Sequence, residues 1–161
     1  MGVTLQSNFS FTEHIGEIIS NCASTLFAIR TLRSKGLSSE LIVTVFKATV
    51  LSKTTYASQF WWGFIGASEK ERLEAFLRKA SRCNFYDGSH TFTELAETAD
   101  RKLFKAVISN PEHVMFPLLP PMKDSNMYNL RDRAHIFKLP SKKSPLTDRN
   151  FIIRMLYKDS Y

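Results

Sequence analysis

The strongest constraint on folding in this 161-residue chain is a repeated helical pattern. Through the first two-thirds of the sequence, apolar residues recur every three or four positions between helix start and stop signals, as in amphipathic α-helices. The first run opens on a capping-box pattern, Ser10 with Glu13, and ends in a cationic turn before Gly36. Strand-like alternation is confined to the few residues around Val3 to Leu5. The sequence therefore predicts a mainly α fold.

Three further helix starts carry a Ser or Thr cap, and two of these also have a Glu three residues later. The starts are Ser38 or Ser39, the pair Ser68 and Glu71, and the pair Thr91 and Glu94. Asp87-Gly88 is typical of a turn, and the last run stops before Pro111. We expect residues 10–115 to form a bundle of about four amphipathic helices.

The chain changes character after residue 115, where five of its six prolines lie. Residues 116–161 are predicted to be an extended tail, closed by a short helix over Phe151 to Tyr157 that Thr147 or Asp148 caps. Residues 123–161 carry nine Lys and Arg against four Asp and Glu, most of the net charge of +7. A basic tail fits attachment to nucleic acid, but it also fits a solvated segment that only aids solubility.

The residues give little support for catalysis or metal binding. The four His are isolated, and two Cys are too few for a Cys/His zinc site. Phe85-Tyr86-Asp87-Gly88 looks like a polymerase turn but offers one carboxylate where two-metal chemistry needs at least two. The chain is expected to be no enzyme by itself and to hold no cofactor. With no signal-peptide pattern and no long apolar stretch, we expect an intracellular protein, nuclear or cytoplasmic, and no membrane partner.

Several stretches resemble, in order and spacing, the part of LINE-type (jockey-like, non-LTR) retrotransposon reverse transcriptases that follows the palm. The opening Gly2-Val3-Thr4-Leu5-Gln6-Ser7-Asn8-Phe9-Ser10-Phe11 with His14-Ile15 is similar to "LGV-x-L-D-x-N-L-S-F-x-x-H-I". Tyr56-Ala57-Ser58 through Trp61-Trp62-Gly63-Phe64 is similar to "Y-A-S-P-x-W-W-G-F", with Gln59 at the Pro position. Further likenesses are Arg72 to Ala80, Phe92 to Leu95, Tyr128 to His135 ("Y-N-L-R-x-R-x-H", with Asp132 where Pro is frequent) and Asn150 to Asp159.

The resemblance implies that three parts of the chain have different roles. Residues 1–9 would be the remnant of a strand after the palm, residues 10–115 a thumb, and residues 116–161 its basic tail. Such thumbs hold RNA or the primer–template duplex by its backbone, independently of sequence. The Mg²⁺ of the parent RNA-directed DNA polymerase would bind in the palm, whose acidic ligands this chain lacks. The implied nucleic-acid-binding residues are Arg30, Arg33, Lys35, Lys47, Lys53, Arg78, Lys79, Arg82, Arg131, Arg133, Lys142 and Lys143.

Other interpretations of these residues remain open. Arg30 and Arg33 also suit a helix C-terminus, and Arg78 also suits an ion pair with Glu74. Trp61 and Trp62 suit base stacking, although aromatic residues at helix ends are more often core. The whole chain also suits a protein-interaction module that docks a partner such as the missing palm, or a transposable-element remnant without a selected function.

Overall fold

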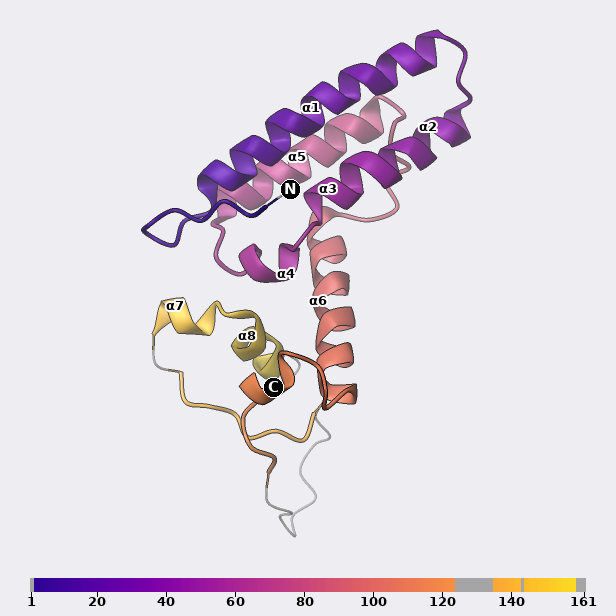
Figure 1. Ribbon diagram of the computed structural model, residues 1–161. Helices are drawn as coiled ribbons and strands as arrows, with labels where there is room; N and C mark the ends of the chain where they lie inside the picture. The colour runs from indigo at the N-terminus through magenta and orange to yellow at the C-terminus, as the bar shows by residue number, and fades with distance from the viewer. Residues whose placement is uncertain (1, 124–134, 143, 159–161) are drawn as a thin grey trace. The chain divides into compact units, whose positions relative to one another are not determined.

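The structure, a computed structural model, describes residues 2–123, 135–142 and 144–158. It is mainly helical, as predicted, and forms two compact units, Met1–Ala99 and Asp100–Tyr161. The helices are α1 (Thr12–Ser34), α2 (Ser39–Phe46), α3 (Ser52–Thr54), α4 (Ser58–Trp61), α5 (Ala67–Arg82), α6 (Phe92–Ser109), α7 (Pro145–Asp148) and α8 (Phe151–Tyr157) (Figure 1). A π-helical turn, Lys47–Leu51, joins α2 to α3, and a 3-10 turn, Phe116–Leu118, follows α6. The division into units falls inside α6.

Helix α1 ends as its sequence predicts but begins differently. The N–H of Gly36 donates to Arg33 O at 3.0 Å and that of Leu37 donates to Leu32 O at 3.2 Å. This Schellman closure needs a left-handed residue, which Gly36 supplies with a φ of +92°. At the other end the N-cap is Phe11, and the Ser10 hydroxyl accepts from Thr12 N instead of the backbone of Glu13. The predicted capping box does not form, because the helix begins one residue later than it requires.

In the first unit α1 packs against both α2–α3 and α5, and the three run side by side (Figure 1). The buried residues of α1 include Ile15, Ile18, Cys22 and Ile29, whose spacings of three, four and seven place them on one stripe. Facing helices contribute the side chains that close this core. They include Ile42, Phe46 and Val50 from the α2 side and Leu73, Phe76, Leu77 and Ala80 from α5. No residue of the described segment 2–9 forms a strand.

The aromatic segment after α3 belongs to this core. Trp61 and Trp62 are 0% and 4% exposed, and their rings lie 6.2 Å and 5.6 Å from the Phe92 ring. The indole N–H of Trp61 donates to the carbonyl of Tyr56 at 3.1 Å, so its polar atom is satisfied inside. The core interpretation of the two Trp is confirmed, and neither ring is available to stack on a base.

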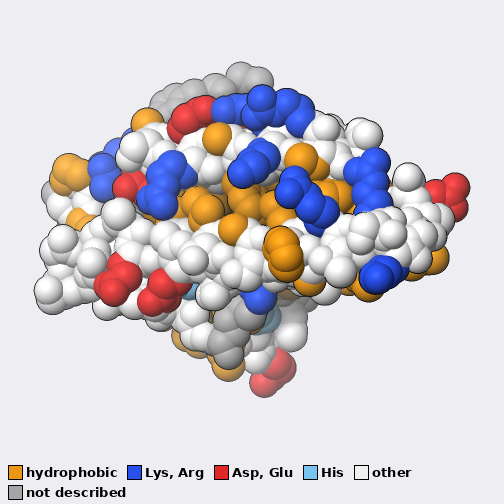
Figure 2. Space-filling view, turned by 90° about the horizontal axis from the view of Figure 1, so that it is seen from above, with side chains coloured by type: hydrophobic (Ala, Val, Ile, Leu, Met, Phe, Trp, Pro, Cys, Tyr) orange, Lys and Arg blue, Asp and Glu red, His pale blue; other side chains and the backbone are white. Residues whose placement is uncertain are grey.

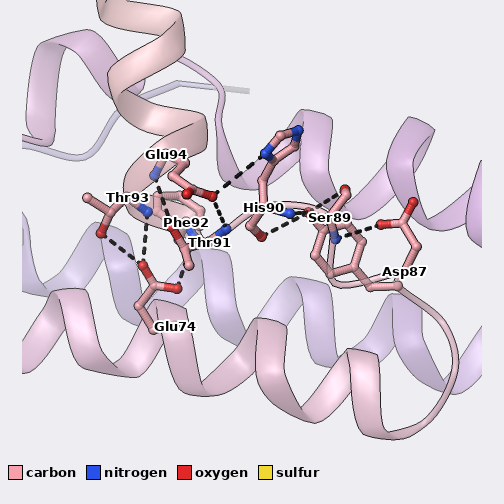
Figure 3. Close-up of polar contacts among 9 residues, drawn as sticks. Glu74, Asp87, Ser89, His90, Thr91, Phe92, Thr93 and Glu94 are labelled. Carbon is pink, nitrogen blue, oxygen red and sulfur yellow. Dashed lines mark hydrogen bonds and ion pairs between the residues drawn. The ribbon is translucent and has the colours of Figure 1, made fainter.

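Hydrogen bonds accepted by two carboxylates stabilise the start of α6 and its contact with α5 (Figure 3). Thr91 and Glu94 exchange the predicted capping-box hydrogen bonds, at 2.9 Å and 3.2 Å. The carboxylate of Glu74, from α5, accepts from the backbone N–H groups of Phe92 and Thr93, both at 2.9 Å. Two donors at the start of α6 are thus satisfied by the neighbouring helix.

The start of α5 itself differs from the predicted pairing of Ser68 with Glu71. The helix begins at Ala67, and Gly66 N–H donates to the Glu69 carboxylate at 3.1 Å. The box therefore lies two residues earlier than predicted, and this shift leaves the Glu71 side chain to pair with Arg78 instead.

The second unit has its own core. Phe104 of α6 packs with Phe137, Phe151, Ile152, Met155 and Leu156. Buried His135 accepts from Phe137 N–H on Nδ1 and therefore donates from Nε2 to the carbonyl of Leu156, at 2.8 Å. Asp100, fully buried, pairs with Arg154. The terminal helix α8 has the predicted bounds, and Asn150 caps it rather than Thr147 or Asp148. The described residues after 115 include a 3-10 turn, α7 and α8, and several of them pack with Leu103, Phe104 and Ile108 of α6.

Candidate functional site

A groove of about 550 Å³ runs between α1 and α5 on the surface of the first unit. In Figure 2 apolar side chains form a strip with Lys and Arg side chains around it. The lining residues, taken together, are Ile19, Ala23, Leu26, Phe27 and Arg30 of α1, Arg72, Ala75, Phe76 and Lys79 of α5, and Cys83 and Phe85 beyond α5. We call this surface the α1–α5 groove.

Helical spacing builds both walls. Ile19, Ala23 and Leu26 lie four and three residues apart on α1, so they share a face. Arg72, Ala75 and Lys79 do the same on α5. The small Ala side chains on the two walls leave space between the helices, and this space is the groove. Phe27, at its edge, is 72% exposed, the largest exposed fraction of any Phe described.

Three cations lie on the walls, Arg30 from α1 and Arg72 and Lys79 from α5. We call them the cationic rim. No described residue that lines the groove is acidic, and within the described part of the chain no ion pair involves any of the three. Three cations without an ion pair among the described residues are suited to attract an anionic group.

Other cations predicted from the sequence already have partners. The Lys47 ammonium lies 2.6 Å from the Asp87 carboxylate, and the Arg78 guanidinium lies 2.5 Å from Glu71 rather than pairing with Glu74. Arg33 donates from Nη1 to the carbonyl of Cys83 at 2.6 Å and lies 5.8 Å from the Phe85 ring centroid. The contacts of Lys47 and Arg33 join different segments of the first unit, whereas the pair of Arg78 with Glu71 lies within α5.

The remaining candidates are scattered. Lys35 and Arg82 are exposed near the ends of α1 and α5, and Lys53 lines a second, smaller pocket. Lys142 lies 4.7 Å from the ring centroid of Tyr157 in the second unit. Arg131, Arg133 and Lys143 lie outside the described residues, as does most of the Tyr128–His135 motif.

Sequence reasoning missed Arg72, although its signal was present. Arg72 and Lys79 are seven residues apart in a helix, a spacing that places both on one face. What the spacing does not show is that α1 supplies Arg30 to the same groove, since that depends on how the two helices pack.

The Asp87 turn is a structural feature. Its carboxylate accepts from Lys47 and from Ser89 N–H, and these hydrogen bonds lower the pKa of Asp87 to about 2. Gly88 follows with a φ of +69°. These contacts stabilise the turn between α5 and α6 and account for the Asp87 carboxylate without a metal ion.

A second pocket, of about 300 Å³, lies beside the N-terminal segment and includes His14, Glu17 and Lys53. The His14 ring is 4% exposed and accepts from Thr4 N–H at 3.3 Å on Nδ1. Its Nε2 has no hydrogen-bond partner in the described part of the chain. Burial lowers the pKa of His14 below its ordinary 6.5, although Glu17 opposes this, so the fold favours the neutral ring.

The described residues contain no group of three or more His, Cys, Asp or Glu that could hold a metal ion. Among them, no helix has the length and apolar character needed to span a membrane. No known protein family matches this chain, and no curated protein or solved structure is significantly similar to it.

Proposed function

We propose that this chain binds RNA or an RNA–DNA duplex through its phosphates, as the non-catalytic thumb and tail region of a LINE-type reverse transcriptase. The observation that carries the proposal is the cationic rim, where Arg30, Arg72 and Lys79 meet from two helices without ion-pair partners within residues 2–123. Phosphate contacts require no base-specific hydrogen bonds, so binding would be independent of sequence. The polymerase chemistry would belong to a palm elsewhere.

The spacing of the rim supports the proposal. Arg72 and Lys79 are separated by two helical turns, roughly 10 Å, which is comparable to the distance between alternate phosphates along one strand. Arginine offers a planar fork of donors that suits phosphate oxygens. The positive tail adds a further attraction without fixing the position of the ligand.

A titration with a fluorescent RNA–DNA duplex tests the proposal. Affinity should fall steeply between about 50 mM and about 200 mM salt, as counterion release requires. The double variant R30Q/K79Q should weaken binding and reduce the log–log salt slope by between about 1 and 2, because two phosphate contacts are lost. The matched variant K47Q/R78Q removes the same charge from residues that are already paired, and it should change the slope much less.

Absence of binding to duplex and to single strands at low salt would contradict the proposal. Binding that both double variants leave intact would place the contact away from the cationic rim. Preference for one sequence over its scrambled version would contradict recognition by phosphates alone.

A further inference from the structure

We propose that the α1–α5 groove is a docking site for an acidic amphipathic α-helix of another protein. The apolar floor would receive its apolar stripe, and Arg30, Arg72 and Lys79 would pair with carboxylates flanking that stripe. The inference goes beyond the phosphate binding proposed above and does not depend on it.

The apolar floor is the first argument, because phosphate binding does not use it. Ile19, Ala23 and Leu26 from α1 lie opposite Ala75 and Phe76 of α5, with no hydrogen-bonding side chain among them. A duplex presents charged backbone to a protein surface and gains nothing from covering such side chains. An amphipathic helix buries a stripe of apolar residues at positions i, i+3, i+4 and i+7, and a groove between two helices suits that stripe.

The character of the floor also argues against single-stranded nucleic acid. Base stacking requires aromatic faces that are open to the ligand. Phe76 and Phe85 are only 7% and 3% exposed, so Phe27 is the one ring among the described lining residues with an open face. A mostly aliphatic floor with one exposed aromatic residue at its edge packs against Leu, Ile or Met side chains better than against bases.

The positive charge of the cationic rim determines which kind of partner helix can bind in the groove. The described lining residues include three cations and no carboxylate, so a basic or neutral helix would leave the rim unpaired or repelled. The chain itself carries a net charge of +7, which disfavours a second copy as the occupant. Complementarity therefore selects a partner helix with Glu or Asp on both sides of its apolar stripe.

The length of the groove sets the size of the ligand. The α1 wall extends from Ile19 to Arg30, about three helical turns or roughly 16 Å. A peptide of about 16 residues with three apolar turns covers this wall and leaves its ends in solvent. The same peptide would occupy the cationic rim and would compete with phosphates for it.

The probe is a fluorescein-labelled peptide of that length, with Leu at i, i+3, i+4, i+7 and i+11 and Glu on both flanks. Two control peptides replace every Glu by Gln, or keep the composition and scramble the Leu spacing. With the full chain at about 0.15 M salt, we expect the periodic acidic peptide to bind at least about tenfold tighter than either control, since both floor and rim contribute.

Two sets of variants locate the binding. Ala23→Gln fills the floor without changing charge, and Phe27→Ser removes an exposed ring, so neither should alter folding. Each should weaken peptide binding by about tenfold, because each change disturbs an apolar contact with the peptide, and leave binding of the RNA–DNA duplex unchanged. The R30Q/K79Q variant should bind both the peptide and the duplex more weakly. The K47Q/R78Q variant should bind both with nearly the affinity of the parent chain.

Several results would overturn the inference. One is the absence of peptide binding, and another is equal binding of the periodic and scrambled peptides, which would show attraction by charge alone. Equal loss of peptide and duplex binding in Ala23→Gln would assign the floor to nucleic acid. Concentration-dependent dimerisation lost in Phe27→Ser would assign it to a second copy. A failure of duplex binding with peptide binding intact would affect only the phosphate proposal.

Discussion

The Arg33 guanidinium donates from Nη1 to the backbone carbonyl of Cys83 at 2.6 Å, joining the last turn of α1 to the C-cap of α5. A cation at a helix C-terminus can donate a hydrogen bond to one of the free carbonyls there, and it is attracted by the negative end of the helix dipole. The same side chain lies 5.8 Å from the ring centroid of Phe85, a lining residue of the α1–α5 groove. Arg33 thus joins the end of α1 to the end of α5 at one end of the groove.

Replacing Arg33 with Met should therefore destabilise the first unit by about 1 kcal/mol, the usual value for a partly exposed hydrogen bond to a charged group. Urea denaturation followed by circular dichroism measures this change. Arg30→Met, which removes the same charge from a residue without such a contact, is the control and should stay within about 0.5 kcal/mol of the parent. Equal effects of the two variants would mean that the Arg33 contact contributes nothing to folding.

Glu74 should matter to stability more than any other carboxylate on α5. It accepts three hydrogen bonds at the start of α6, from Phe92 N, Thr93 N and Thr93 Oγ1. Glu74→Ala should cost about 2 to 3 kcal/mol, since two backbone donors lose their acceptor. Glu71→Ala removes an exposed ion pair and should cost less than about 1 kcal/mol. Similar denaturation midpoints for the two variants would refute this ranking.

His14 should make the folded state sensitive to mild acid. Burial lowers its pKa in the folded chain, so the unfolded chain binds a proton more readily. The stabilisation is complete above the unfolded pKa of about 6.5 and is lost as the pH falls through the lower folded value. Stability measured between about pH 8 and about pH 5 should decline more steeply for the parent than for His14→Gln. Parallel profiles would mean that His14 binds protons equally in both states.

The ion pair of Asp100 with Arg154 should make a large contribution to the stability of the second unit. Asp100 is fully buried, and its partner comes from α8, the terminal helix. Arg154→Met would leave a buried carboxylate without its pairing cation and should cost between about 3 and 5 kcal/mol. Hydrogen exchange should accelerate in residues 135–158, and protection of α1 and α5 should change little. Exposed Arg149→Met is the control, and equal exchange in the two variants would contradict the role of the pair.

Local sequence signals, such as capping residues and glycine stops, predicted that helices form. The Gly36 stop and the box of Thr91 with Glu94 appear where the sequence places them, because each rests on contacts between residues a few positions apart. The start of α5 was predicted two residues late. Gly66 has no side chain to suggest a cap, and Glu69 bonds its backbone N–H instead.

The sequence predicted some of the cations of the candidate site, but it did not show which cations lack an ion pair. Arg30 and Lys79 were among the expected binding residues, and the structure leaves them without ion pairs in the described part of the first unit. Lys47 and Arg78 looked equivalent in sequence, yet Asp87 and Glu71 pair with them. Whether a cation is available depends on its neighbours in space, and Asp87 lies forty positions from Lys47 in the sequence.

The sequence by itself determined that the chain is helical, where α2, α6 and α8 start, where α1 ends, and which faces are apolar, because capping and periodicity act over one or two turns. Tertiary structure alone decided that α1 and α5 leave a groove between them, that Arg72 joins Arg30 and Lys79 there, and that described residues after 115, such as Phe137 and Phe151, pack with Phe104 of α6. These features arise from contacts between residues far apart in the chain, whose energies depend on a relative placement that no local pattern encodes.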